Sequence, residues 1–198
     1  MVGRTRATFI AASIAVFLLG NTVAVIIPHV APRDASRQLI VTQTLERELV
    51  IPVDGVSARS LVDTWGAARH EGRKHEGIDI MAHAGTPVRA TAAGRIAKLF
   101  QSVRGGTTIY EFDQSGRFIF YYAHLQAYAL GVHVGQVVEQ GQLIAYVGAT
   151  GNTTTPHLHF EIQRAVAPAQ WWRGVAVNPY VPLKTARLPA SETPAVAQ

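Results

Sequence analysis

The sequence predicts an all-β fold, an antiparallel sheet or barrel-like domain that follows an apolar N-terminal segment. Two observations support this prediction. After residue 50 the chain has many short runs of valine, isoleucine, tyrosine and phenylalanine separated by glycine, proline, asparagine or aspartate, which is typical of strands joined by turns. Before that point, the stretch Ala7–Ile27 carries no charged residue. A chain of 198 residues has room for one domain and such an appendage.

The apolar stretch Ala7–Ile27 is long enough to cross a membrane. A helix that rises about 1.5 Å per residue would span a hydrocarbon core of roughly 30 Å with these residues. We therefore predict a transmembrane anchor over residues 7–27. A cleaved signal peptide is the main alternative, but the stretch exceeds the usual apolar signal core of roughly 7–15 residues and no clear Ala-x-Ala site follows. A buried core helix is the weaker alternative, because the stretch is N-terminal and apolar on all faces.

The charges that flank this stretch leave its orientation open. Arg4 and Arg6 precede it and Arg33 and Arg37 follow it, so the count of nearby basic residues is tied. The short, positively charged amino terminus favours a cytoplasmic N-terminus. We therefore expect a single-pass protein of the cell membrane whose domain lies on the periplasmic or extracellular side. The absence of cysteine fits this side without proving it, since many exported proteins also lack disulfides.

The rest of the chain divides into three predicted parts. Residues 28–50 are a connector, with helix-forming residues in its second half. Residues 51–185 form the domain. Residues 186–198, which are rich in alanine, proline, serine and threonine, form a tail that we expect to be disordered.

Successive strands are expected within the domain at residues 85–90, 93–99, 107–112, 118–125 and 141–148. The segment Gln114-Ser-Gly-Arg117 between two aromatic-rich runs predicts a hairpin turn. Residues 135–144 are similar to the strand-turn-strand of biotinyl and lipoyl carrier domains, but no carrier lysine lies beside them. A carrier function is therefore disfavoured.

Residues 157–162 carry the clearest candidate for a functional strand. They alternate His, Leu, His, Phe, Glu and Ile, so the polar side chains share one face of a strand and the apolar ones the other. On a helix, His157 and His159 would diverge by about 200°. Glu161 shares the polar face, where it either orients a histidine as a hydrogen-bond acceptor or is a surface residue.

A second fragment supplies further candidate ligands. His75, Gly77 and Asp79 alternate with other residues, so they too would share a face of a strand, and Gly77 would leave space between the other two. Two imidazoles and one carboxylate suit Zn²⁺, and three protein ligands would leave a fourth position for water. A single histidine out of eight would mean little, but alternating pairs in two fragments are difficult to attribute to packing. A third predicted strand ends in His124.

Four segments, in this order and spacing, resemble the lysostaphin/LytM-type metallopeptidases of peptidase family M23: Trp65-Gly66, His75-x-Gly-x-Asp79, Tyr122-Ala-His124-Leu125 and Pro156-His157-Leu-His159-Phe-Glu161. The resemblance covers about residues 51–182. It implies that His75, Asp79 and His159 hold one Zn²⁺ per chain. It also implies that His124 and His157 are active-site histidines that do not bind the metal, with peptidoglycan peptides as substrate.

The sequence departs from this family pattern in two places. Some members have a tyrosine upstream of the first ligand that helps to stabilise the tetrahedral intermediate, and here Arg69 stands six residues before His75. We take Arg69 as a candidate for contact with substrate or transition state. Thr155 stands where a glycine often precedes the second fragment.

The segment from His70 to His75 resembles the helical H-E-x-x-H zinc motif but is one residue too long. Gly72 also disfavours a helix there. We therefore expect His70 to be an exposed loop residue.

The formal charge of +5 suits an anionic envelope polymer. Nucleic acid is the usual competing partner, but the basic residues are scattered and no nucleic-acid motif is present, so we expect none. Trp171-Trp172 lie in an insertion and either pack on the edge of the barrel or line a substrate groove. No feature identifies a regulatory envelope protein.

Three classes of function follow. We favour a zinc-dependent endopeptidase that hydrolyses the peptide cross-links of peptidoglycan. The alternative is a non-catalytic LytM-type domain that binds and activates another cell-wall hydrolase, but such regulators characteristically lose metal ligands, and all three are present here. A carrier or purely structural domain would have no use for the active-site residues. Which of His124 and His157 is the general base stays open.

Overall fold

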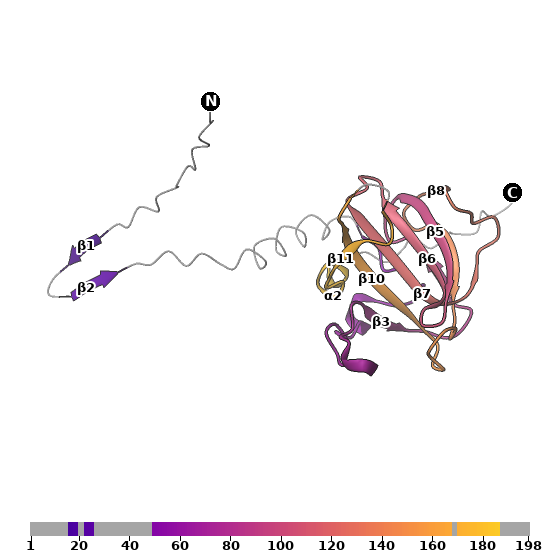
Figure 1. Cartoon of the computed structure of the whole chain (residues 1–198), viewed down its shortest axis with the longest axis horizontal. Helices are drawn as coiled ribbons and strands as arrows, with labels where there is room; N and C mark the ends of the chain where they lie inside the picture. The colour runs from indigo at the N-terminus through magenta and orange to yellow at the C-terminus, as the bar shows by residue number, and fades with distance from the viewer. Residues whose placement is uncertain (1–15, 20–21, 26–48, 168–169, 187–198) are drawn as a thin grey trace, which may run out of the picture. The chain divides into compact units, whose positions relative to one another are not determined.

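The computed structural model describes residues 16–19, 22–25, 49–167 and 170–186 (Figure 1). The chain divides into two units, residues 1–37 and 38–198. In the first unit, strands β1 (Val16–Leu19) and β2 (Thr22–Val25) pair antiparallel, with Val16 opposite Val25.

These two strands lie inside the stretch 7–27, where the sequence analysis predicted a transmembrane helix. The structure therefore does not show that helix. Val16, Thr22, Val23 and Val25 are β-branched, which gives a local reason for extended backbone. The other residues of the stretch lie outside the described part, and the part that is described contains no helix long and apolar enough to cross a membrane. The anchor and its orientation stay predictions.

The second unit is built from antiparallel strands, so the predicted all-β class is confirmed. Its short helical segments are η1 (Ala58–Ser60), η2 (His70–Gly72) and α2 (Tyr180–Lys184). Its strands are β3 (Ile78–Met81), β4 (Pro87–Arg89), β5 (Gly94–Ser102), β6 (Gly106–Asp113), β7 (Phe118–Tyr128), β8 (Val137–Val138), β9 (Leu143–Val147), β10 (His157–Ala165) and β11 (Gly174–Val177).

The strands form one sheet in the order β11-β10-β7-β6-β5-β8, and Figure 1 shows its central strands side by side. Strand β3 pairs with the first half of β10, and β11 pairs with the second half. Strand β9 pairs with the end of β7 and with β4. Strand β10 therefore lies between β3 and β7, which places its first residues at the junction of three strands.

The core lies against one face of this sheet. On β10, Leu158, Phe160 and Ile162 are fully buried, and the Phe160 ring lies 5.3 Å from that of Tyr122. The intervening histidines and glutamate point to the other face, which confirms the alternation predicted for residues 157–162. Burial of the apolar residues thus fixes which way the polar ones point.

The strands predicted within residues 85–148 are present, and the 114–117 hairpin joins β6 to β7. The amide of Gly116 donates to the Asp113 carbonyl at 2.9 Å, and Gly116 has φ +70°, a conformation in which glycine has no steric penalty. The prediction that His75 lies on a strand with Asp79 holds only for Asp79, because β3 begins at Ile78.

The last two residues of the predicted connector pack with the domain. Leu49 and Val50, the last residues of the predicted connector, are buried. The Val50 amide donates to the Thr91 carbonyl at 2.9 Å, and the Thr91 hydroxyl donates to the Val50 carbonyl at 2.6 Å. Residues 28–48 of the connector and 187–198 of the tail lie outside the described residues.

Candidate active site

A hairpin of residues 67–75 carries His75 to the sheet. The His75 amide donates to the Ala67 carbonyl and the Arg69 amide to the Arg73 carbonyl, each at 2.9 Å. At the tip of this 67–75 hairpin, Glu71 and Gly72 have φ values of +63° and +68°. Two successive left-handed residues reverse the chain there, which excludes the helical H-E-x-x-H reading. His70 is exposed, as predicted.

The pairing of β3 with β10 brings Asp79 to His159. These residues are directly opposite each other in the antiparallel register. Opposed residues project from the same face of a sheet with Cβ atoms about 4.5–5.5 Å apart. Residues eighty positions apart in the chain are therefore neighbours because of strand pairing alone.

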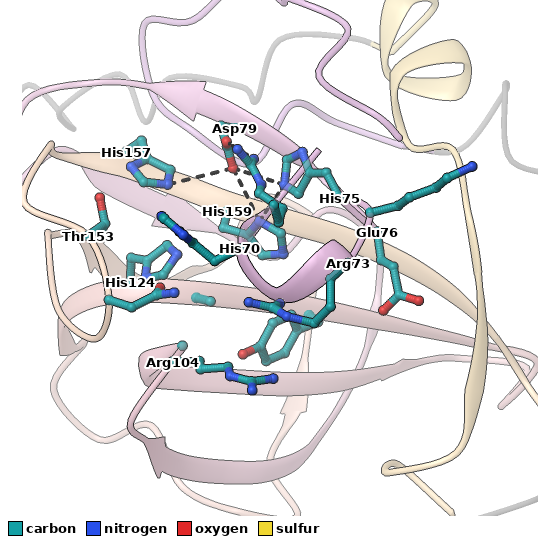
Figure 2. A pocket seen from close by; sticks show the side chains of 16 residues that line it. His70, Arg73, His75, Glu76, Asp79, Arg104, His124, Thr153, His157 and His159 are labelled. Atoms are coloured by element: carbon teal, nitrogen blue, oxygen red, sulfur yellow. Dashed lines mark hydrogen bonds and ion pairs between the residues drawn. The ribbon is translucent and has the colours of Figure 1, made fainter. Parts of the chain in front are cut away.

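Three potential ligand atoms converge at this point (Figure 2). His75 Nε2 lies 2.8 Å from His159 Nδ1 and 3.1 Å from Asp79 Oδ1, and the last two atoms are 3.2 Å apart. Ligand atoms of a tetrahedral zinc ion with bonds of about 2.0–2.1 Å lie about 3.3 Å from one another. The donor set and its spacing therefore fit a zinc ion.

The outer hydrogen bonds decide which ring nitrogens can bind a metal. His75 Nδ1 donates to the Thr64 carbonyl at 2.7 Å, and His159 Nε2 donates to Glu161 Oε1 at 2.9 Å, since both oxygens can only accept. The remaining nitrogens, His75 Nε2 and His159 Nδ1, are the two that face each other. Glu161 therefore contacts a candidate ligand directly, and Gln163 donates to its other oxygen at 2.6 Å.

Thr64 was not identified by the sequence analysis, although it contacts both ends of the first ligand fragment. Besides its carbonyl contact with His75, its hydroxyl accepts a hydrogen bond from the Asp79 amide at 3.0 Å. Thr64 thus fixes the spacing between the two predicted ligands.

Asp79 and His159 shift each other's pKa in opposite directions. Burial alone would raise the pKa of Asp79, but hydrogen bonds with His159 and His75 outweigh it and hold that pKa well below its usual range. Burial would lower the pKa of His159, but Asp79 and Glu161 outweigh it and raise the pKa to about 9. A metal ion at His159 must displace a proton, so metal affinity should increase with pH up to about that value.

Arg69 lines the pocket, and its guanidinium is paired with Asp79. Arg69 Nη2 lies 2.5 Å from Asp79 Oδ2, the carboxylate oxygen that does not face the two histidines. This ion pair leaves Asp79 Oδ1 as the oxygen that faces His75 and His159. Contact of Arg69 with substrate or transition state stays a prediction.

His124 and His157 lie beside the candidate ligands. Their ring centroids are 4.9 Å apart, and His157 Nε2 is 3.6 Å from Asp79 Oδ1. His157 Nδ1 donates to the Thr155 carbonyl at 2.7 Å, and His124 Nδ1 donates to the Thr150 carbonyl at 2.8 Å. Each ring, when neutral, therefore keeps Nε2 as an unprotonated acceptor.

Burial lowers the pKa of His124 to about 4, with a further contribution from the neighbouring His157 and His159, although the Thr150 carbonyl acts in the opposite direction. His124 is therefore neutral at physiological pH.

The backbone of His124 breaks the alternation of β7. With φ +60°, it is one of two non-glycine residues with positive φ among those described, and the register of β6 and β7 shifts nearby. Tyr121, Ala123 and His124 all line the pocket as a result, whereas Tyr122 is fully buried in the core. Strain of this kind is common at functional sites.

The pocket has a volume of about 310 Å³ and includes residues that the sequence analysis missed. These are Tyr121, whose ring lies 6.0 Å from that of His159, together with Arg73, Lys74, Glu76, Arg104, Gly105, Ala123, Asn152 and Thr153. Trp171 does not line this pocket. Its ring lies 4.7 Å from Tyr110, so it packs on the sheet, while Trp172 is 60% exposed.

These features define a His/Asp/His group that could hold a metal ion, with two further histidines beside it, on an antiparallel β-sheet. The sequence profile of peptidase family M23 matches residues 73–179, more than half of the chain, and the chain belongs to this family.

Individual relatives agree with this assignment. The chain is 36% identical over 130 residues to the L-Ala–D-Glu endopeptidase of Bacillus subtilis (strain 168), covering 61% of this chain and 38% of that protein. It is 38% identical over 89 residues to the peptidoglycan DD-endopeptidase ShyC of Vibrio cholerae, covering 45% and 20%. The chain thus spans well under half the length of either relative.

Among solved structures, the catalytic domain of lysostaphin from Staphylococcus simulans superposes with a TM-score of 0.55 at 29% identity, over 72% of this chain and 97% of that one. The predicted lysostaphin/LytM-like fold is confirmed by this match.

Proposed function

We propose that this chain is a zinc-dependent endopeptidase that hydrolyses peptide cross-links of peptidoglycan. The observation that carries the proposal is the convergence of His75, Asp79 and His159 beside two further imidazoles. Family membership supports a peptidase, and the names of two relatives, an L-Ala–D-Glu endopeptidase and a peptidoglycan DD-endopeptidase, support the substrate class.

His75, Asp79 and His159 would hold the zinc ion through the three facing atoms. Bound zinc supplies a polarised scissile carbonyl and a coordinated water whose pKa falls to about 7. Three protein ligands leave the fourth position that such a water needs. The hydrogen bonds from His75 to Thr64 and from His159 to Glu161 hold the ligand rings in the required tautomers.

His157 is the better placed of the two remaining histidines to accept a proton. Its Nε2 is an acceptor and lies 3.6 Å from Asp79 Oδ1, the predicted ligand atom. His124 is a weaker base because its pKa is about 4, and it would be a correspondingly strong acid once protonated. We therefore assign proton abstraction to His157. His124 presents an unprotonated Nε2 while it is neutral, so it can stabilise the oxyanion or deliver a proton to the leaving amine only after it takes up a proton, for which the proton abstracted by His157 is the source.

An activator without catalytic function would need none of these contacts. The intact ligand set, the tautomer-fixing hydrogen bonds and the strained His124 support catalysis instead. We further propose that the domain acts outside the cytoplasmic membrane, held there by residues 7–27, on the basis of the uncharged stretch in the sequence.

The test uses the full-length chain, purified in mild detergent and incubated with purified sacculi. We expect release of soluble peptidoglycan fragments that stops on addition of a chelator and resumes when zinc is restored. His159→Ala is the matched control and should release none under any condition. Release by the wild type that persists in chelator, or release by His159→Ala, would contradict a zinc-dependent reaction.

A further inference from the structure

The pocket beside the candidate metal group has strongly basic walls. Its lining contains four cationic side chains and two carboxylates. One of those carboxylates, Asp79, already faces two histidines and an arginine. The other, Glu76, is exposed. A bound divalent cation would add further positive charge, so the pocket should favour an anionic substrate. The four cations are Arg69, Arg73, Lys74 and Arg104.

Arg104 is held in place by its backbone while its side chain stays accessible. It lies in the turn between β5 and β6, where its carbonyl accepts a hydrogen bond from the Asn152 amide at 3.0 Å. Its side chain is 60% exposed and lines the pocket on the same side as His124 (Figure 2). A guanidinium on a fixed backbone can form paired hydrogen bonds with a carboxylate.

A carboxylate of the protein already lies at this position. Glu71 Oε2, at the tip of the 67–75 hairpin, accepts from Arg104 Nη2 at 2.9 Å and lies 3.7 Å from Arg73 Nε. The Glu71 side chain is 68% exposed, and exposed ion pairs of this kind are weak. Glu71 also has a left-handed backbone, with φ +63°, which is unfavourable for a residue other than glycine. Another carboxylate could therefore replace Glu71 at little cost.

We propose that the pocket selects peptides that carry a free carboxylate, and that Arg104, with Arg73, binds this carboxylate in place of Glu71. The inference rests on the proposed function and specifies its substrate class. The preferred substrate is an acidic stem peptide, such as one with the free α-carboxylate of D-glutamate, rather than a neutral glycine bridge.

The test compares two synthetic stem tetrapeptides with amidated C-termini, L-Ala-γ-D-Glu-L-Lys-D-Ala and the same peptide with D-isoglutamine, so that the second peptide has an amide in place of the one free carboxylate of the first. The full-length, zinc-loaded protein is assayed for binding by calorimetry and for cleavage. Loss of a charge-assisted hydrogen bond should weaken binding of the amide peptide by about tenfold. This preference should decrease as salt is raised.

Two variants should act in opposite directions. Arg104→Gln should weaken binding of the carboxylate peptide by about tenfold and leave the amide peptide unchanged, because the charged partner is lost. Glu71→Gln should tighten binding of the carboxylate peptide by about two- to threefold, because a competitor for Arg104 is removed. If the ion pair between Glu71 and Arg104 only stabilised the fold, both variants would change the affinity for both peptides in the same direction. Arg59→Gln, an exposed arginine in η1 that does not line the pocket, is the matched control.

The inference would be overturned if the wild type bound the two peptides equally. It would also be overturned if both variants changed the affinity for the carboxylate peptide in the same direction. The proposed function would survive that result if both peptides, or sacculi, are still cut. If nothing is cut, the proposed function fails, and the binding preference still decides the selectivity for a carboxylate.

Discussion

His159 and Glu161, two residues apart on β10, are joined by a hydrogen bond of 2.9 Å from Nε2 to Oε1. Residues i and i+2 of a strand lie on the same face, so the strand itself supplies this contact. It fixes the ring tautomer that presents Nδ1 to His75 and Asp79. The HLHFE segment thus encodes a predicted ligand together with the residue that orients it.

Removal of this contact should weaken the metal site without destroying it. Glu161→Ala should bind zinc 10- to 100-fold more weakly, the range typical for loss of a carboxylate that orients a ligand histidine. Glu161→Gln keeps an acceptor and should recover most of that affinity. Competition with a chromophoric chelator measures both variants. Wild-type zinc affinity in Glu161→Ala would show that the hydrogen bond does not support the metal site.

The two histidines outside the ligand group should affect catalysis alone. His124→Ala and His157→Ala should each lose about 10²–10⁴ in rate, because proton transfer or oxyanion stabilisation is removed. Both should retain zinc, whereas His159→Ala should lose zinc and activity together. Peptide cleavage and zinc content are measured on the same preparations. Full cleavage by both single variants would refute the mechanism, and zinc loss in His157→Ala would mean that the wrong member of the H-x-H pair was assigned.

One variant can decide whether Arg69 supports the metal site or contacts the transition state. Because its guanidinium pairs with Asp79 Oδ2, Arg69→Gln should lower zinc affinity by several fold, as expected when a partner of a ligand carboxylate is lost. A transition-state role would instead lower kcat at full zinc occupancy. Zinc titration and steady-state kinetics of this variant separate the two roles. Unchanged zinc affinity with reduced kcat would favour direct contact with the transition state.

Glu111 should make stability depend on pH. Its carboxyl is fully buried, and burial raises its pKa to about 8, although the hydrogen bond from the Tyr122 hydroxyl acts against this. Between pH 4.5, its ordinary pKa, and about 8 the folded state holds a proton that the unfolded state has released. The contribution of this group to the free energy of unfolding therefore falls as pH rises, by up to about 1.4 kcal/mol per pH unit, and levels off above the folded pKa.

Glu111→Gln keeps the shape of this side chain without the ionisation. Urea unfolding at pH 6 and pH 8 should show that the wild type loses more stability than the variant over this interval. Identical pH dependence in the two proteins would mean that Glu111 does not retain its proton in the folded state.

The sequence could predict the site residues that lie in segments with a regular strand alternation. The alternation in residues 157–162 predicted β10 and the face of each side chain, because burial of Leu158 and Phe160 leaves the histidines no other direction. The left-handed φ of His124 breaks the alternation of β7, so Tyr122, which belongs to the family motif, is a core residue, while Tyr121 lines the pocket.

Residues placed by turns and by long-range hydrogen bonds were beyond such arguments. Arg104 and Thr64 are placed by the folded arrangement of the β5–β6 turn and by hydrogen bonds to the ligand fragment, and neither belongs to a periodic segment. The start of β3 was also predicted too early, because the 67–75 hairpin occupies the chain up to His75. Tertiary contacts rather than local propensity decided these positions.

The zinc content of Asp79→Ala, compared with that of the wild type, tests the central claim most directly. If His75, Asp79 and His159 supply all the protein ligands, the full-length wild type should hold about one zinc ion per chain. Asp79→Ala should lose most of it, because two histidines alone form a weak site. Elemental analysis of matched preparations measures both. Equal zinc in the two proteins would contradict the assignment of this metal centre.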